Sequence, residues 1–173
     1  FKIKNITLKK LNKIKNKTFT VKVYNLTEKK LEYISYKNYP DISVSLLIKM
    51  TTCIPLLFKP IQYNNKYYLD GGLTGNMVYS KKNKNYFGIY ISTKCITDIK
   101  NMNVLQYFQL LSNSLFEKYD FDVNTNPRIV NLSNLFNESC FDFNINIQQK
   151  KDFINKSVEY TLKHIENYKL FKI

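Results

Sequence analysis

The chain has 173 residues, of which 44% are hydrophobic, and it carries a formal net charge of +14 at pH 7. This hydrophobic content suits one domain with a buried core and argues against a disordered chain. No run of about 18 apolar residues is present, which excludes an ordinary membrane-spanning helix.

The positive charge does not by itself indicate a nucleic-acid-binding protein. Arg128 is the only arginine, whereas lysine, asparagine, isoleucine and tyrosine abound, and these four residues are encoded by AT-rich codons. We therefore attribute the charge first to genome composition. Nucleic-acid readout favours arginine because its planar guanidinium donates two parallel hydrogen bonds. We expect no nucleic-acid partner.

The cysteines and acidic residues predict no metal site. Three widely spaced cysteines, Cys53, Cys95 and Cys140, argue against both a disulfide framework and zinc binding. The aspartates near the middle of the chain lack the spacing of a calcium loop; they are Asp120, Asp122 and Asp142. With no histidine or helix start placed to activate it, we expect Cys53 to be a buried thiol.

The first predicted elements are a helix and a hairpin. Residues 6–17 place Leu8, Leu11 and Ile14 at helical spacing among lysines, which predicts a short amphipathic helix. Residues 18–26 alternate as a strand with one apolar face, formed by Phe19, Val21 and Val23. Residues 27–36 predict a turn and a second strand.

A helix is predicted next, followed by a second hairpin. Asp41 or Ser43 is placed to cap the helix after Pro40, and Pro55 forbids its continuation. Its expected buried face consists of Val44, Leu47, Ile48 and Thr51. An Asn64-Asn65 turn then separates two short strands, the second of which ends at Asp70.

The second half predicts further alternation of strands and helices. Residues 85–92 are apolar with little alternation, which is typical of a buried central strand. Helices are expected over 102–118 and from near Ile147 to about Tyr168, with a short strand at 127–133 between them. The last helix has an apolar stripe of Ile154, Val158, Leu162 (or Thr161) and Ile165. Together the elements predict an α/β layered domain with a partly parallel sheet.

Asp70 is the strongest candidate for a chemical role. It ends a predicted strand and precedes Gly71 and Gly72, two of only four glycines. Glycine permits positive φ and close approach of another backbone, so the carboxylate can reach a group on a different loop. Accepting a proton from a nucleophile is the obvious task. An ordinary Asp-Gly hairpin turn is the alternative.

The order of motifs around Asp70 resembles the patatin-like phospholipase family. Asn25-Leu26-Thr27 ends a strand and Pro40-Asp41 starts a helix, as is usual there. Further matches follow in order: Thr51, Thr52, Ile54, Pro55, Phe58, Pro60, Asp70-Gly71-Gly72 and Asn76. Val78 replaces a proline that is usual in the family, and residues 141–165 resemble its closing segment and final helix.

This resemblance implies a three-layer α/β domain that hydrolyses lipid acyl esters with a Ser-Asp dyad. Asp70 would accept the serine proton directly, with Gly71 and Gly72 completing the motif. The family is calcium-independent, and we expect no cofactor and no metal. No histidine is needed, which agrees with His164, the only one, lying on the predicted last helix as a surface or helix-flank residue.

The nucleophile of such a dyad is not in this chain. The four glycines, at positions 71, 72, 75 and 88, flank no serine in a G-x-S-x-G pattern and build no oxyanion loop. We therefore expect residues 1–173 to be the C-terminal portion of a single patatin-like domain, inactive alone. A truncated or degenerate gene product is the other explanation.

The alternative function is a non-catalytic protein that binds lipids or membrane surfaces. The lysine-rich start could contact anionic headgroups; it contains Lys2, Lys4, Lys9, Lys10, Lys13, Lys15 and Lys17. The expected partners are a phospholipid or other acyl-ester substrate and an anionic membrane surface. The expected location is cytoplasmic or peripheral to a membrane.

Overall fold

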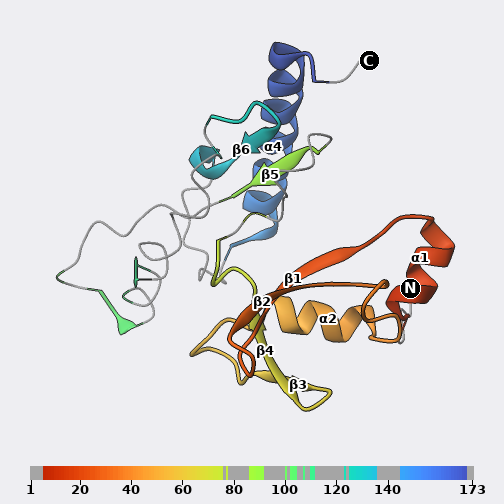
Figure 1. Cartoon of the computed structure of the whole chain (residues 1–173). Helices are drawn as coiled ribbons and strands as arrows, with labels where there is room; N and C mark the ends of the chain where they lie inside the picture. Colours follow the sequence, from red (N-terminus) through yellow and green to blue (C-terminus); the bar gives the residue numbers. More distant parts are fainter. Residues whose placement is uncertain are drawn as a thin grey trace. The chain divides into compact units, whose positions relative to one another are not determined.

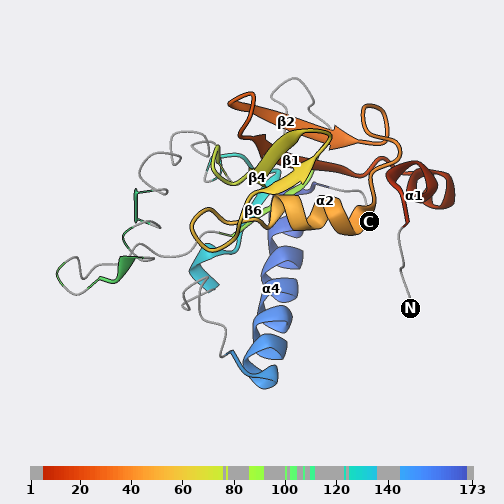
Figure 2. The ribbon, with the colours of Figure 1, turned by 90° about the horizontal axis from the view of Figure 1, so that it is seen from below.

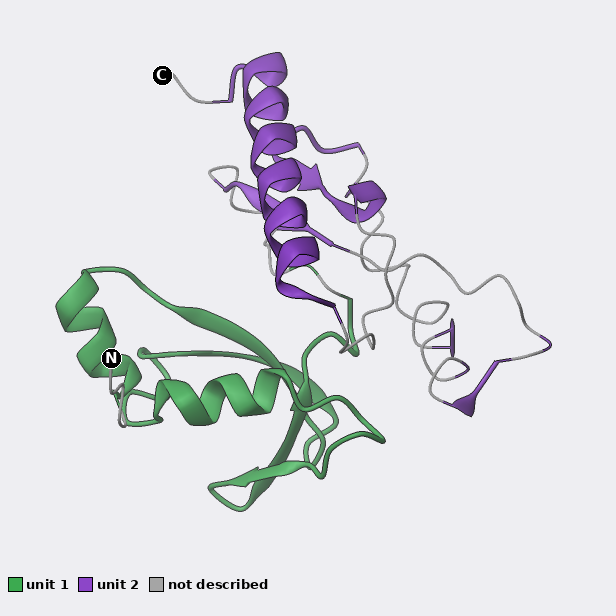
Figure 3. Ribbon diagram, turned by 180° about the vertical axis from the view of Figure 1, so that it is seen from behind, with its two compact units in different colours: residues 1–78 green, residues 79–173 purple. Residues whose placement is uncertain are grey.

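The structure is a computed structural model. It describes residues 6–75, 77, 86–91, 100, 102–104, 107, 110–111, 123, 125–135 and 145–170. The chain divides into two compact units, Phe1–Val78 and Tyr79–Ile173, which Figure 3 shows in green and purple. Each unit is described by itself, and the prediction of a single domain over 1–173 stays a prediction.

The first unit is a four-stranded antiparallel sheet with two helices (Figure 1). In chain order its elements are α1 (Leu8–Lys15), β1 (Thr20–Asn25), β2 (Lys30–Ser35), α2 (Val44–Thr51), β3 (Ile61–Tyr63) and β4 (Lys66–Asp70). The strand order is β2-β1-β4-β3. Both predicted hairpins are therefore present, and β1 and β4 pair at the centre of this sheet.

The core of this unit lies between α2 and the sheet. Helix α2 packs against the two central strands, β1 and β4 (Figure 2). The predicted β1 face is confirmed for Val21 and Val23, whereas Phe19 precedes the strand and is exposed. The buried cluster contains Leu8, Val21, Val23, Ile34, Ile42, Leu47, Met50 and Tyr68.

Ser43, one of the two predicted caps, begins α2. Its side chain accepts a hydrogen bond from the Leu46 N–H at 3.2 Å. The predicted buried face of α2 is partly wrong, because Ile48 is exposed and Met50 is fully buried instead. At 3.6 residues per turn, Met50 lies on the same face as the buried Leu47, whereas Ile48 lies about 100° round the helix from Leu47.

The β3–β4 turn is formed by Asn64 and Asn65, as predicted. Both residues have positive φ, 47° and 59°, which asparagine tolerates better than most residues. This pair of left-handed residues matches the right-handed twist of the flanking strands, as in a type I′ hairpin. The turn thereby sets the register that ends β4 at Asp70.

The described part of the second unit contains β5 (Gly88–Tyr90), β6 (Ile129–Asn131), the short 3₁₀ helix η2 (Ser133–Leu135) and α4 (Ile147–Tyr168). β5 and β6 pair in parallel. Asn146 caps α4 in a capping box with Gln149, which confirms the predicted last helix. Most of the helix predicted over 102–118 lies outside the described residues.

The burial predicted for the strand over 85–92 is wrong, and the apolar stripe of the last helix is largely exposed. Ile89 and Ile91 are 56% and 45% exposed, so the β5 segment is not buried on both faces. On α4 the apolar residues Ile154, Val158 and Leu162 are exposed. Among the residues described, β5 pairs only with β6, and the α4 face that includes His164 lies against the segment around Pro127. Apolar periodicity therefore did not identify the packed face.

The fold class is confirmed as α/β with sheets that are partly parallel. Layering across both units stays a prediction. No helix among the described residues is long and apolar enough to cross a membrane.

Candidate functional site at the end of β4

Asp70 is the last residue of β4 and is half-buried. Its backbone is fixed from two sides: it lies opposite Val23 in the β1–β4 ladder, and its N–H donates to the Cys53 carbonyl at 3.0 Å. Its Oδ1 accepts the Gly72 N–H at 2.8 Å. The carboxylate therefore has a defined position at the carboxyl end of a central strand, and the sequence predicted Asp70 at this strand end.

Gly71 allows two backbones to approach closely. The antiparallel register pairs Val23 with Asp70, so Lys22 lies beside Gly71. A Cβ at position 71 would lie 2.6 Å from the Lys22 carbonyl carbon and 2.8 Å from its Cγ. The expected close approach is thus confirmed at Gly71, but the expected positive φ is not: among the described glycines only Gly75 has it, at 93°.

Lys22 holds the turn that follows Asp70. Its side chain is buried, and its ammonium donates to the carbonyls of Thr74 and Gly75 at 3.0 and 2.6 Å. The Lys22 carbonyl accepts the hydroxyl of Thr51, at the end of α2, at 2.9 Å. One buried lysine therefore connects β1, α2 and the turn. Sequence reasoning missed Lys22, because a lysine between two valines of a strand usually faces solvent.

Burial raises the pKa of the Asp70 carboxyl above its ordinary value, and this effect exceeds two opposing ones. The hydrogen bond from Gly72 and the positive charge of Lys22 both lower the pKa. A carboxylate disfavoured in this way is a stronger base than an exposed one. Oδ2 accepts no hydrogen bond from the described part of the chain, so one oxygen is free to receive a proton.

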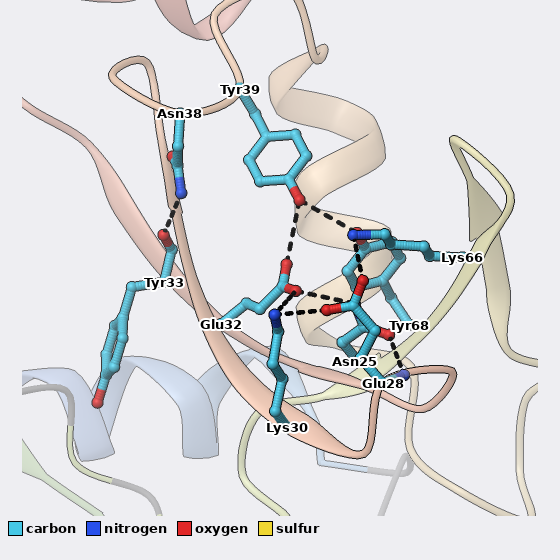
Figure 4. A network of polar contacts seen from close by, with 9 residues as sticks. All are labelled: Asn25, Glu28, Lys30, Glu32, Tyr33, Asn38, Tyr39, Lys66 and Tyr68. Carbon is cyan, nitrogen blue, oxygen red and sulfur yellow. Dashed lines mark hydrogen bonds and ion pairs between the residues drawn. The ribbon is translucent and has the colours of Figure 1, made fainter.

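A polar network further along the sheet fixes the strand that carries Asp70 (Figure 4). The fully buried Asn25 donates to Glu32 Oε1 at 2.8 Å, and the Tyr39 hydroxyl donates to Glu32 Oε2 at 3.1 Å. Tyr68, two residues before Asp70, contacts the Tyr39 hydroxyl at 3.4 Å. Burial raises the Tyr68 pKa, so its hydroxyl stays protonated.

The turn from Asn25 to Glu28 binds the same strand. Asn25 Oδ1 accepts the Glu28 N–H at 3.0 Å, and Thr27 Oγ1 accepts the Tyr67 N–H at 2.9 Å. Glu28 pairs with Lys30 and Lys66, which lower its pKa to about 2. The Asn-Leu-Thr turn singled out in the sequence thus anchors β1 to β4.

The other predicted site residues do not join Asp70 as reactive groups. Cys53 is buried, which confirms the expected buried thiol, and its Sγ donates to the Lys59 carbonyl at 3.2 Å; burial raises its pKa. The His164 Nε2 lies 2.8 Å from the Pro127 carbonyl on the flank of α4. Asn76, Val78, Cys95, Cys140, Asp120, Asp122 and Asp142 lie outside the described residues.

The described residues contain no group of three or more histidine, cysteine, aspartate or glutamate side chains that could hold a metal ion. What they place together is one half-buried carboxylate, a free oxygen on it, and a turn held by a lysine. Such an arrangement can accept and return a proton.

The Lys22→Met substitution is expected to raise the pKa of Asp70 further, because it removes the positive charge that lowers it. It should also destabilise the fold by about 1.5–3 kcal/mol, the range for hydrogen bonds to a charged group. Titration of the Asp70 carboxyl carbon by NMR measures the first effect and urea unfolding the second. The exposed Lys37→Met is the matched control for the lost charge. An unchanged Asp70 titration would contradict this assignment.

Comparison with known proteins finds a family similarity in the first part of the chain. A family model described as patatin-like phospholipase matches residues 2–79, which include Asp70. A curated relative, named Probable lipid hydrolase 463L, of Invertebrate iridescent virus 6, is 28% identical over 134 residues. Over residues 2–79 the chain is similar to the patatin-like phospholipase family.

A solved structure supports the fold. VipD from Legionella pneumophila superimposes with a TM-score of 0.65 over 94% of this chain, at 13% sequence identity. The match to the viral protein covers 73% of this chain and 46% of the viral protein. The match to VipD covers 35% of the VipD chain, so the chain spans less than half the length of either protein.

Proposed function

We propose that this chain supplies the proton-accepting aspartate of a lipid acyl hydrolase, and that Asp70 is that aspartate. The match of residues 2–79 to the patatin-like phospholipase model, and a viral relative named as a probable lipid hydrolase, support a lipid ester as the substrate class. The observation that carries the proposal is the half-buried Asp70 carboxylate, positioned by Cys53 and Gly72 with one oxygen free.

The proposed chemistry is direct proton transfer within a Ser-Asp dyad. As the serine Oγ attacks the ester carbonyl, its proton passes to Oδ2 of Asp70. When the tetrahedral intermediate collapses, the same proton passes to the oxygen of the leaving alcohol, and an acyl-serine remains for water to hydrolyse. Burial makes Asp70 a stronger base, which favours the first transfer.

The serine and the oxyanion donors must come from outside these 173 residues. No serine here is flanked by glycines in the G-x-S-x-G pattern. Asp70 alone lacks the donors that stabilise the oxyanion, usually the largest contribution to catalysis. We therefore expect the chain to be inactive when it is isolated.

A fluorophosphonate probe tests this proposal, because it labels only an activated serine. The complete natural protein is expected to be labelled and to hydrolyse a fluorogenic acyl ester and a phospholipid, whereas the 173-residue chain does neither. The labelled serine, located by peptide mass spectrometry, should lie between glycines. Labelling of a serine within the chain itself, or full activity of the chain alone, would contradict the proposed division of residues.

A non-catalytic lipid-binding protein is the second candidate, favoured by the absence of a glycine-flanked serine in the sequence given. It predicts a complete protein that binds phospholipid vesicles but is neither labelled by the probe nor active on esters. The two functions therefore give opposite results in the same assay.

A further inference from the structure

The loop between α2 and β3 is directly attached to Asp70. Residues 54–58 form a turn in which the Phe58 N–H donates to the Ile54 carbonyl at 3.1 Å. Its two ends, Cys53 and Lys59, are joined by the Cys53 thiol hydrogen bond. Since the Cys53 carbonyl also accepts the Asp70 N–H, this loop and the proposed base share one anchor.

The tip of this loop is apolar and exposed. Leu56 is 70% exposed and Phe58 is 58% exposed. Leu56 also has a φ of 69°, a region that is strained for a non-glycine residue. A glycine or asparagine would adopt this φ with less strain. The leucine side chain is exposed and does not pack in the core. A contact outside the described fold explains both observations.

Charge indicates what that contact is. Between Asp41 and Asp70 the sequence contains no acidic residue. Two exposed lysines, Lys49 on α2 and Lys59 at the base of the loop, come before and after its apolar tip in the sequence. Exposed apolar side chains with cations close by in the sequence match the boundary between anionic headgroups and acyl chains, where lysines are attracted to the headgroups.

We propose that Leu56 and Phe58 insert into the surface of an anionic phospholipid bilayer, with Lys49 and Lys59 on the headgroups. The inference rests on the proposed function in one respect: it brings Asp70 to the surface where a lipid ester is available. It differs from the earlier hypothesis that the lysine-rich start contacts the membrane, because it assigns the apolar contact to a loop beside the proposed base.

The absence of tryptophan from the chain allows a direct test. In the variant Phe58→Trp the only indole lies at the loop tip. Vesicles containing phosphatidylserine are expected to shift its emission to shorter wavelength, and lipids brominated on their acyl chains should quench it. Vesicles of phosphatidylcholine alone should give a weaker effect, and added salt should reduce binding.

Tyr33→Trp is the matched control, because Tyr33 is 44% exposed on β2 of the same unit. Its emission is expected to stay unchanged when the same vesicles bind. If the indole of the Tyr33→Trp variant is quenched and that of the Phe58→Trp variant is not, or if neither responds, the proposal is overturned. This result is independent of ester hydrolysis, so a failure of the membrane contact and a failure of Asp70 as the base are distinguishable.

Substitutions within the loop separate insertion from folding. Leu56→Gly removes the apolar side chain and the strain, so it should weaken vesicle binding about tenfold without lowering Tm. Ile14→Ser, on the lysine-rich α1, should leave binding intact. The reverse pattern assigns membrane binding to α1. A dimer that dissociates in Leu56→Gly, seen by sedimentation, assigns the loop to a second copy of the chain; either result contradicts the proposal.

Discussion

Asp70→Asn in the complete protein is expected to lower kcat for ester hydrolysis by about 10²–10⁴-fold, the usual contribution of a positioned general base. Asparagine has the size of aspartate, and its amide oxygen can still accept the Gly72 N–H. It cannot take up the serine proton. KM should change little, since the substitution removes a proton acceptor and not a binding surface. Steady-state kinetics on one fluorogenic ester measures both constants.

The same substitution is expected to stabilise the fold at neutral pH. Burial raises the Asp70 pKa, so between its ordinary and its raised value the folded chain binds more protons than the unfolded chain. The contribution of this carboxyl to stability therefore falls as pH rises through that window and stays low above it. Asparagine is uncharged throughout, so Tm of the variant should exceed wild type at pH 7, and the difference should close in acid.

Asp41→Asn is the matched control, because Asp41 is exposed in the same unit. It should change neither kcat nor the pH dependence of Tm by a comparable amount. Retention of wild-type kcat by Asp70→Asn would remove Asp70 from the mechanism. Lost activity together with a lowered Tm at every pH would indicate a purely structural aspartate.

Local signals in the sequence predicted much of the fold. Ser43 before α2, the Asn64-Asn65 turn and the start of α4 are set by interactions within a few residues, and all were predicted. Burial was predicted less well. Which face of a helix is covered depends on distant segments, so Ile48 was assigned to the buried face of α2 and is exposed.

The candidate site shows the same division. The sequence alone places a carboxylate at a strand end before two glycines, and the structure finds Asp70 there. Lys22 is far from Asp70 in the sequence, and only the β1–β4 register brings it beneath the following turn. The sequence predicted that another backbone approaches Gly71 closely. That this backbone belongs to Lys22 follows only from the long-range pairing of β1 with β4.

Gly71→Ala is expected to destabilise the first unit by about 3 kcal/mol or more, at or above the upper end of the usual cost of overpacking. The new methyl group would overlap the Lys22 carbonyl, which is backbone in the central strand β1 and also accepts the Thr51 hydroxyl. Neither strand can move without disturbing the β1–β4 ladder. Urea unfolding of the chain measures the loss.

The substitution should also displace Asp70, because relief of the overlap separates Gly71 from Lys22 at the residue next to the carboxylate. Gly72→Ala is the control: Gly72 does not have positive φ, and its N–H to Asp70 is kept. A stability loss confined to Gly71→Ala would establish that this glycine is required by the backbone of Lys22. Equal losses in the two variants would show that the turn, and not the strand contact, requires glycine.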